Sequence, residues 1–132
     1  MKRLTLILAL MAIAVLLAAC GGGEPEATTL SFDGLEPFAF NPDAASANAG
    51  GQVEVTLNNV GALEHSWSLV SGDADPTTVT DSNAIAGTAT GNVAPGDSKT
   101  INFTAPTAGT YQFVCTVPGH AAGGMVGTMT LE

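Results

Sequence analysis

A strict alternation of apolar and polar side chains over residues 53–57, Val-Glu-Val-Thr-Leu, constrains the fold of this chain more than any other feature. A period of two is typical of a β-strand with one buried and one solvated face, so positions 53, 55 and 57 are expected to face a core and positions 54 and 56 to face water. Two glycines (50–51) precede this run and two asparagines (58–59) follow it, and both pairs are expected to form turns.

Four other short runs have the same character and are bounded by Gly, Pro or Asn. They cover residues 67–70, 99–103, 111–114 and 126–131. Several short strands separated by turns predict an all-β, single-domain antiparallel sandwich or barrel. Residues 71–95 are rich in Thr, Ala and Gly without clear periodicity, and we expect them to form a long crossing connection that holds a short helix.

The N-terminal segment has the layout of an export signal. Lys2 and Arg3 precede 16 almost uninterruptedly apolar residues, 4–19, and the sequence Leu-Ala-Ala-Cys ends at Cys20. An uncleaved membrane anchor is the competing interpretation, but a helix that crosses a bilayer needs about 20 apolar residues, more than this run has. Because Leu-Ala-Ala-Cys resembles the lipobox of bacterial lipoproteins, we expect a lipoprotein signal peptide over residues 1–19 and a lipidated Cys20, with an ordinary signal peptide as the alternative.

The predicted mature protein begins with a spacer and carries a strongly acidic charge. Residues 20–29 include three glycines and, apart from Pro25, no apolar side chain larger than Ala after the cysteine, which predicts a flexible linker before a domain over residues 30–132. Setting aside Lys2 and Arg3 leaves one cation, Lys99, against 12 carboxylates, a net charge of −11. This excludes nucleic acid as a natural partner and argues against electrostatic docking on anionic lipid. A lipid on Cys20 would hold the domain at the cell membrane, on its extracytoplasmic side.

Soft and borderline metal ligands lie close together near the C-terminus. Cys115, His120 and Met125 fall within eleven residues between two predicted strands, and the other histidine, His65, precedes a third strand. With Cys20 assigned to processing, Cys115 has no disulfide partner, and a free thiol outside the cytoplasm is open to oxidation. Two histidines, one cysteine and a weak axial methionine are the ligands of a blue-copper site.

Each of these residues taken alone also fits a plain structural role. A free cysteine is commonly a small buried hydrophobe, and Met125 and Met129 could both fill the core. His65 could be a hydrogen-bonded polar group at a strand start, and His120 an ordinary loop residue. The joint spacing favours the metal site over these alternatives, and Trp67 is expected in the core.

These motifs resemble those of the cupredoxins, the type 1 blue copper proteins, and within that family they are most similar to the auracyanins. The similarity rests on residues 40–42, 50–59, 64–67 and 111–125, with four residues between Cys115 and His120 and four between His120 and Met125. The resemblance implies a plastocyanin-like Greek-key β-sandwich that holds one copper ion. His65, Cys115 and His120 would be its equatorial ligands and Met125 its axial ligand.

The resemblance also implies a function. The chain would be a monomeric electron carrier, not an enzyme, and would pass single electrons between membrane redox complexes, photosynthetic or respiratory. A c-type cytochrome and a quinol-oxidising complex are the partners implied, with electrons passing through a surface-lying His120 framed by Pro118, Ala121 and Ala122. A cell-envelope copper-binding or carrier protein without electron transfer is the first alternative, and a metal-free structural sandwich is the second.

One residue departs from the family pattern. Many cupredoxins place Asn directly after the first histidine ligand, where it ties that strand to the ligand loop, and this chain has Ser66. Because serine is shorter, we expect a weaker tie to Thr116, with the Ser66 backbone N–H as the contact that reaches the Cys115 sulfur.

Overall fold

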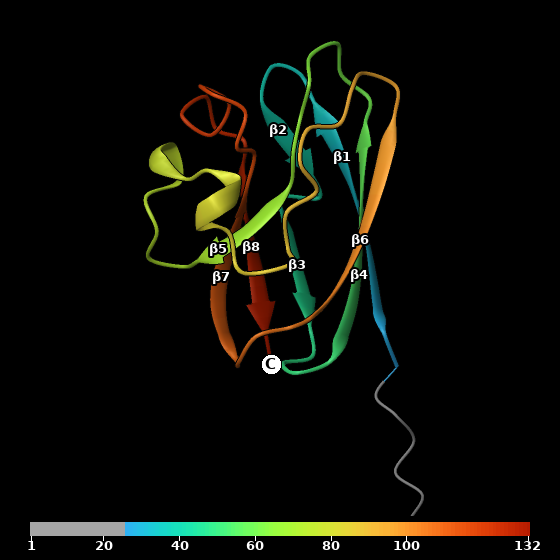
Figure 1. Ribbon diagram of the computed structural model, residues 1–132, viewed down its shortest axis with the longest axis vertical. Helices are drawn as coiled ribbons and strands as arrows, with labels where there is room; N and C mark the ends of the chain where they lie inside the picture. The colour runs from blue at the N-terminus through green and yellow to red at the C-terminus, as the bar shows by residue number, and fades with distance from the viewer. Residues whose placement is uncertain (1–25) are drawn as a thin grey trace, which may run out of the picture.

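The computed structural model describes residues 26–132, which form two four-stranded sheets packed face to face (Figure 1). One sheet has the strand order β2-β1-β4-β6 and the other the order β3-β8-β7-β5. The strands are β1 (Thr28–Leu35), β2 (Ala39–Asn41), β3 (Ala44–Ala47), β4 (Gln52–Asn59), β5 (Ser68–Ser71), β6 (Ser98–Thr104), β7 (Gly109–Val114) and β8 (Val126–Leu131). The predicted single-domain all-β sandwich is therefore confirmed.

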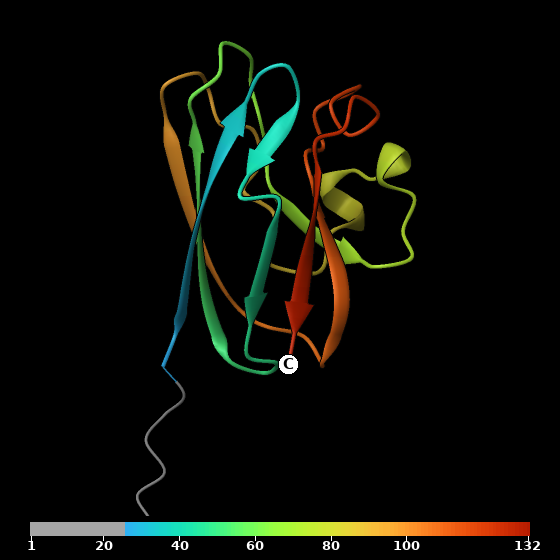
Figure 2. The same ribbon diagram turned by 180° about the vertical axis from the view of Figure 1, so that it is seen from behind.

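The antiparallel arrangement expected from the strand pattern holds for most strand pairs, but each sheet also contains one parallel pair. Strand β1 runs parallel to β4, and β3 runs parallel to β8, while the other pairs are antiparallel. Strands joined by a tight turn must be antiparallel, whereas parallel neighbours need a longer connection. Here β2 and β3 separate β1 from β4 in the chain, and the chain changes sheets between β2 and β3 (Figure 2).

All five runs predicted as strands overlap strands, but only the run over residues 126–131 has the predicted bounds at both ends. Val53, Val55 and Leu57 of β4 are buried as expected, while Glu54 and Thr56 are half-buried on the outer face. The asparagines 58–59, expected as a turn, are the last two residues of β4. Strand β1 starts at residue 28, so residues 28–29, which were expected in the linker, belong to the first strand. The predicted signal peptide, Cys20 and most of the linker lie outside the described residues.

Aromatic side chains from both sheets form the centre of the core. Trp67 is fully buried, as expected, and its ring stacks on Phe32 and Phe113 with both centroid distances at 5.6 Å. Phe103 lies 6.3 Å from the same ring, and Phe40 lies 5.3 Å from Phe113. Truncating such a side chain to Ala typically costs about 3–5 kcal/mol, so this cluster contributes strongly to the stability of the sandwich.

The long connection between β5 and β6 contains two short 3₁₀ helices, η1 (Pro76–Thr78) and η2 (Asp81–Asn83), which confirms the expected short helix. Isolated bridges from His65 to Val93 and from Ser68 to Ala89 hold this connection against the start of β5. Within residues 26–132, no helix has the length and apolar character needed to cross a membrane.

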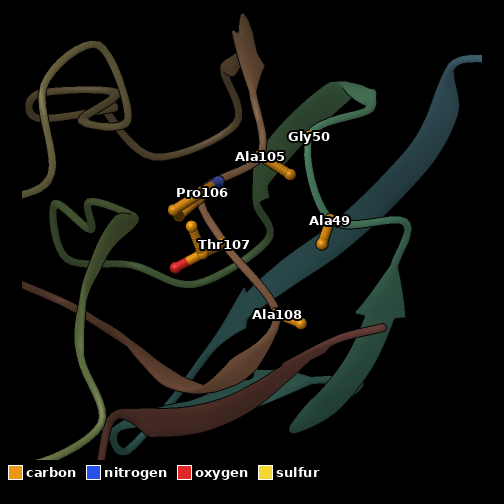
Figure 3. A pocket seen from close by; sticks show the side chains of 6 residues that line it. All are labelled: Ala49, Gly50, Ala105, Pro106, Thr107 and Ala108. Carbon is orange, nitrogen blue, oxygen red and sulfur yellow. The ribbon is translucent and has the colours of Figure 1, made fainter.

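A shallow hollow of about 480 Å³ lies at the end of the sandwich that carries the C-terminus, away from the 115–125 loop (Figures 1 and 3). Its lining consists of small residues and one proline: Ala49, Gly50, Ala105, Pro106, Thr107 and Ala108. None of these six residues is titratable or a usual metal ligand.

Candidate metal centre

Three predicted ligands converge at one end of the sandwich although they are far apart in the sequence. His65 comes from the segment between β4 and β5, Cys115 directly follows β7, and His120 lies in the loop before β8. One ligand atom from each lies within 4.8 Å of the others, and all three residues are buried. The two Nδ1 atoms of the histidines are 3.2 Å apart, and Nδ1 of His120 is 3.5 Å from Sγ of Cys115.

Backbone hydrogen bonds fix the position of His65. Its N–H donates to the carbonyl of Val93 at 3.2 Å, and its own carbonyl accepts from the Val93 N–H at 2.7 Å. The side chain of Asn59 donates to the same Val93 carbonyl at 2.8 Å and to the Leu63 carbonyl at 2.7 Å. The segment that leads into His65 is therefore held by the backbone of Val93 and by the side chain of Asn59.

The 115–125 loop is closed by its own backbone. The Cys115 N–H donates to the Met125 carbonyl at 3.1 Å, and the Met125 N–H donates to the His120 carbonyl at 3.0 Å. These bonds link all three predicted ligands of the loop to one another, and Met125 is fully buried. Met129, by contrast, lies in β8 opposite Tyr111 and is a core residue.

Ser66 ties the first histidine segment to the ligand loop more firmly than its length led us to expect. Its N–H donates to Sγ of Cys115 at 3.3 Å, as predicted. Its hydroxyl also lies 2.8 Å from the Thr116 hydroxyl and accepts from the Thr116 N–H at 2.8 Å. The predicted weakness of this tie is wrong, because the two segments approach closely enough for a serine to bridge them.

The protonation chemistry of the site suits a metal ion. Burial lowers the pKa of His65, the neighbouring His120 lowers it further, and Glu36 opposes both effects. The Nδ1 atoms of His65 and His120 are 3.2 Å apart, which leaves room for only one proton between them. At least one of these nitrogens therefore directs a lone pair toward the other ligand atoms. Nε2 of His65 makes no hydrogen bond to any described residue, and the Glu36 carboxylate lies 3.6 Å away. Two imidazoles beside a cysteine sulfur are ligands that fit copper, and a buried thioether suits its reduced form.

Residues around His120 include one that the sequence analysis missed. The ring of Phe38, from the turn between β1 and β2, lies 4.4 Å from the His120 ring. The expected surface position of His120 is wrong, because the residue is buried and only 6% exposed. Of the expected apolar frame, Pro118 and Ala122 are exposed and Ala121 is half-buried. No sequence signal marked Phe38, because it reaches His120 from a turn more than eighty residues away in the chain.

The segment before His65 adds further apolar surface at this end. Val60 and Leu63 are 59% and 47% exposed, and they are the two large hydrophobic side chains left exposed in the described part of the chain. The Glu36 carboxylate accepts hydrogen bonds from the backbone N–H groups of Ala62 and Leu63 at 3.1 and 3.0 Å. This turn is therefore held in place while its apolar side chains face solvent.

Comparison with known proteins agrees with this geometry. The family model for copper-binding proteins of the plastocyanin/azurin family matches residues 26–132. Auracyanin-A of Chloroflexus aurantiacus is 32% identical, with 89% of this chain and 90% of that protein covered. Plastocyanin of Prochlorothrix hollandica is 31% identical, with 99% and 94% covered.

Solved structures show the same relationship. Reduced auracyanin from Roseiflexus castenholzii matches with a TM-score of 0.71 and 33% identity, covering 82% of this chain and 99% of that one. Auracyanin A, described as a "blue" copper protein, matches with a TM-score of 0.66 and 28% identity, covering 81% and 100%. The chain therefore belongs to the plastocyanin/azurin family of copper-binding proteins.

Proposed function

We propose that this chain is a blue copper electron carrier that shuttles single electrons between membrane redox complexes, photosynthetic or respiratory. The observation that carries the proposal is the buried convergence of His65, Cys115 and His120 within 4.8 Å. With Met125 as the axial ligand, these residues would hold one type 1 copper ion. When bound, copper supplies one-electron exchange between Cu(I) and Cu(II).

The protein's own contribution is to keep the ligands in one arrangement in both oxidation states. Backbone hydrogen bonds link Cys115, His120 and Met125, and they resist a change in the conformation of the loop. The pair of hydrogen bonds between His65 and Val93 does the same for the first ligand. A site whose geometry changes little when an electron arrives has a low reorganisation energy.

The apolar end of the molecule offers a docking surface for a redox partner. Val60 and Leu63 are exposed in the segment before His65, and Pro118 and Ala122 are exposed in the loop that holds the nearly buried His120. We infer that electrons pass through the His120 ring during brief contacts made by this small surface. The acidic remainder favours a basic partner, such as a c-type cytochrome, and the association rate should fall as salt concentration rises. A quinol-oxidising complex would be the electron donor, and the carrier itself would be a monomer.

The N-terminal sequence supports the membrane tether that we propose. A signal peptide over residues 1–19 would direct export, and a lipid on Cys20 would anchor the mature protein on the extracytoplasmic side of the cell membrane. The linker before β1 would let the domain move between partners.

A reciprocal pair of cysteine variants tests both parts of the proposal. The copper-loaded protein should show an intense blue absorption band from a thiolate–Cu(II) bond. Cys115→Ser should abolish the band and keep incorporation of a radiolabelled fatty acid, whereas Cys20→Ser should keep the band and abolish incorporation. A colourless wild-type protein that still binds Cu(I) would favour the copper-carrier alternative and overturn the electron-carrier proposal.

The two methionines provide a second matched pair, which tests the axial ligand. Met125 and Met129 are both buried, but only Met125 belongs to the ligand loop. Met125→Leu should raise the reduction potential and change the spectrum, because a ligand to copper is lost. Met129→Leu should change neither, and equal effects of the two variants would contradict the assignment.

A further inference from the structure

A chain of hydroxyl groups connects an acidic residue of the β5–β6 connection to the Cys115 sulfur. The Thr116 hydroxyl donates to Oδ1 of Asp81 at 2.6 Å. The hydroxyls of Thr116 and Ser66 are 2.8 Å apart, and the Ser66 hydroxyl lies 3.7 Å from Sγ of Cys115. The order Asp81, Thr116, Ser66, Cys115 joins three segments that are separate in the sequence.

Counting the available protons shows which hydroxyl donates at each step of this series of hydrogen bonds. Each hydroxyl has one proton, and an ionised carboxylate can only accept. The Thr116 proton goes to Asp81, so the Thr116 oxygen is left to accept from Ser66. The Ser66 oxygen already accepts from the Thr116 N–H, and its single proton is used on Thr116 at 2.8 Å. The Cys115 sulfur therefore keeps one donor, the Ser66 N–H at 3.3 Å.

We propose that Asp81 is a positioning residue that controls how strongly the Cys115 sulfur is hydrogen-bonded and so lowers the reduction potential of the copper site. This inference rests on the proposed function. A thiolate carries more negative charge opposite Cu(I) than opposite Cu(II), so each donor to the sulfur favours the reduced state. By drawing the Ser66 proton away, Asp81 removes such a donor and favours the oxidised state.

Two features indicate that the effect passes through hydrogen bonds rather than through the charge of Asp81. Asp81 is exposed, so water and salt screen its field. Ser66 is fully buried, so water does not compete for its proton. Asp81 also accepts from the Ser68 hydroxyl at 3.2 Å, and thus contacts both the first residue of β5 and the residue that follows Cys115.

Three variants of the full copper-loaded chain separate these effects. Asp81→Ala removes the oxygen that accepts from Thr116, whereas Asn would keep an accepting Oδ1 at the same place. Thr116→Val removes the relay without changing the charge. Each should free the Ser66 proton for the sulfur and shift the reduction equilibrium toward Cu(I) about tenfold, the size expected for one hydrogen bond. Asp73→Ala is the control, because Asp73 is an exposed carboxylate of the same connection that accepts from Ser71.

The readouts are the reduction potential, measured by spectroelectrochemistry, and the deuterium shift of the copper–sulfur vibration in the resonance Raman spectrum. Asp81→Ala and Thr116→Val should enlarge the deuterium shift, and Asp73→Ala should leave both quantities unchanged. In a Ser66→Ala background, Asp81→Ala should no longer move the potential. Equal shifts from Asp81→Ala and Asp73→Ala, or a shift with Asp81→Ala but none with Thr116→Val, would overturn the relay.

The metal-free protein gives a readout that does not depend on copper. Its proton NMR spectrum should show a protected Thr116 hydroxyl signal, shifted downfield by the charged acceptor, and Asp81→Ala should abolish that signal. A wild-type protein without a blue band would refute the proposed function and, with it, the tuning of a copper potential. A blue wild-type protein whose Thr116 hydroxyl exchanges freely would refute the role of Asp81 alone.

Discussion

Asn59 provides a direct test of how the fold holds the first ligand segment. It ends β4 on the inward face, and its amide group makes three hydrogen bonds while only 1% exposed. Nδ2 donates to the carbonyls of Leu63 and Val93 at 2.7 and 2.8 Å, and Oδ1 accepts from the Gly61 N–H at 3.0 Å. These partners all lie in segments that flank His65. We predict that Asn59→Ala both destabilises the domain and weakens copper binding.

The magnitude follows from the three bonds. Each net hydrogen bond contributes about 0.5–1.5 kcal/mol, so their loss should lower the free energy of unfolding by about 3 kcal/mol. Residues 26–132 number 107. With an unfolding entropy of about 2.1 cal/mol/K per residue, this loss corresponds to a fall in Tm of about 13 °C. Circular dichroism during heating and during urea unfolding of the metal-free protein measures both quantities.

The neighbouring Asn58 is a matched control. It has the same side chain in the same strand, and it also makes three side-chain hydrogen bonds, to Ser31, Asp33 and Ser98. Asn58 is half-buried on the outer face, where water can replace its partners, so Asn58→Ala should change the free energy of unfolding by about 0.5 kcal/mol or less. If the two alanine variants unfold at the same temperature, burial does not decide the strength of these bonds and the reasoning is refuted.

Three further outcomes are expected from single sites. Gly61→Ala would place a Cβ 2.9 Å from Nε2 of His65, so it should weaken copper binding about 10–100-fold in a competition titration, and an unchanged affinity would contradict the packing. Hydrogen bonds from Thr77 lower the pKa of Asp75, so the stability that this carboxylate contributes is present above its unfolded pKa and is lost as pH falls through the folded one. NMR titration should show the lowered pKa, and Asp75→Asn should remove that part of the pH dependence of unfolding. Trp67 is fully buried, and its Nε1 has no hydrogen-bond partner among the described residues, so its fluorescence should be blue-shifted and resistant to acrylamide until unfolding.

Local sequence pattern was enough to predict most of the sheet framework. The period of two in residues 53–57 reports directly on which side chains face the core, because neighbouring residues of a strand point to opposite faces. The first three strands were not predicted. Strands β2 and β3 are too short to show a period, whereas Leu30-Ser31-Phe32-Asp33 of β1 does alternate with a period of two, a signal that was overlooked. The parallel partner of β1 is β4, and such a long-range pairing leaves no local signal.

The candidate ligands were predictable for a similar reason. Cys115, His120 and Met125 belong to one loop, so their spacing is visible in the chain itself. His65 was recognised because it precedes a predicted strand and because the remaining ligands called for a second imidazole. Residues that support the ligands were not predicted, since Phe38 and Asp81 reach them from other loops.

The sequence alone thus determined the alternating strands, the acidic charge and the donor atoms of the metal centre, because each depends on residue type and on short spacing. Only the tertiary structure decided that β1 and β3 join their sheets in parallel, that the His65 and Cys115 segments meet, and that Ser66 bridges them. Those contacts depend on how the two sheets pack, and packing brings together residues whose separation in the chain carries no information about their distance in space.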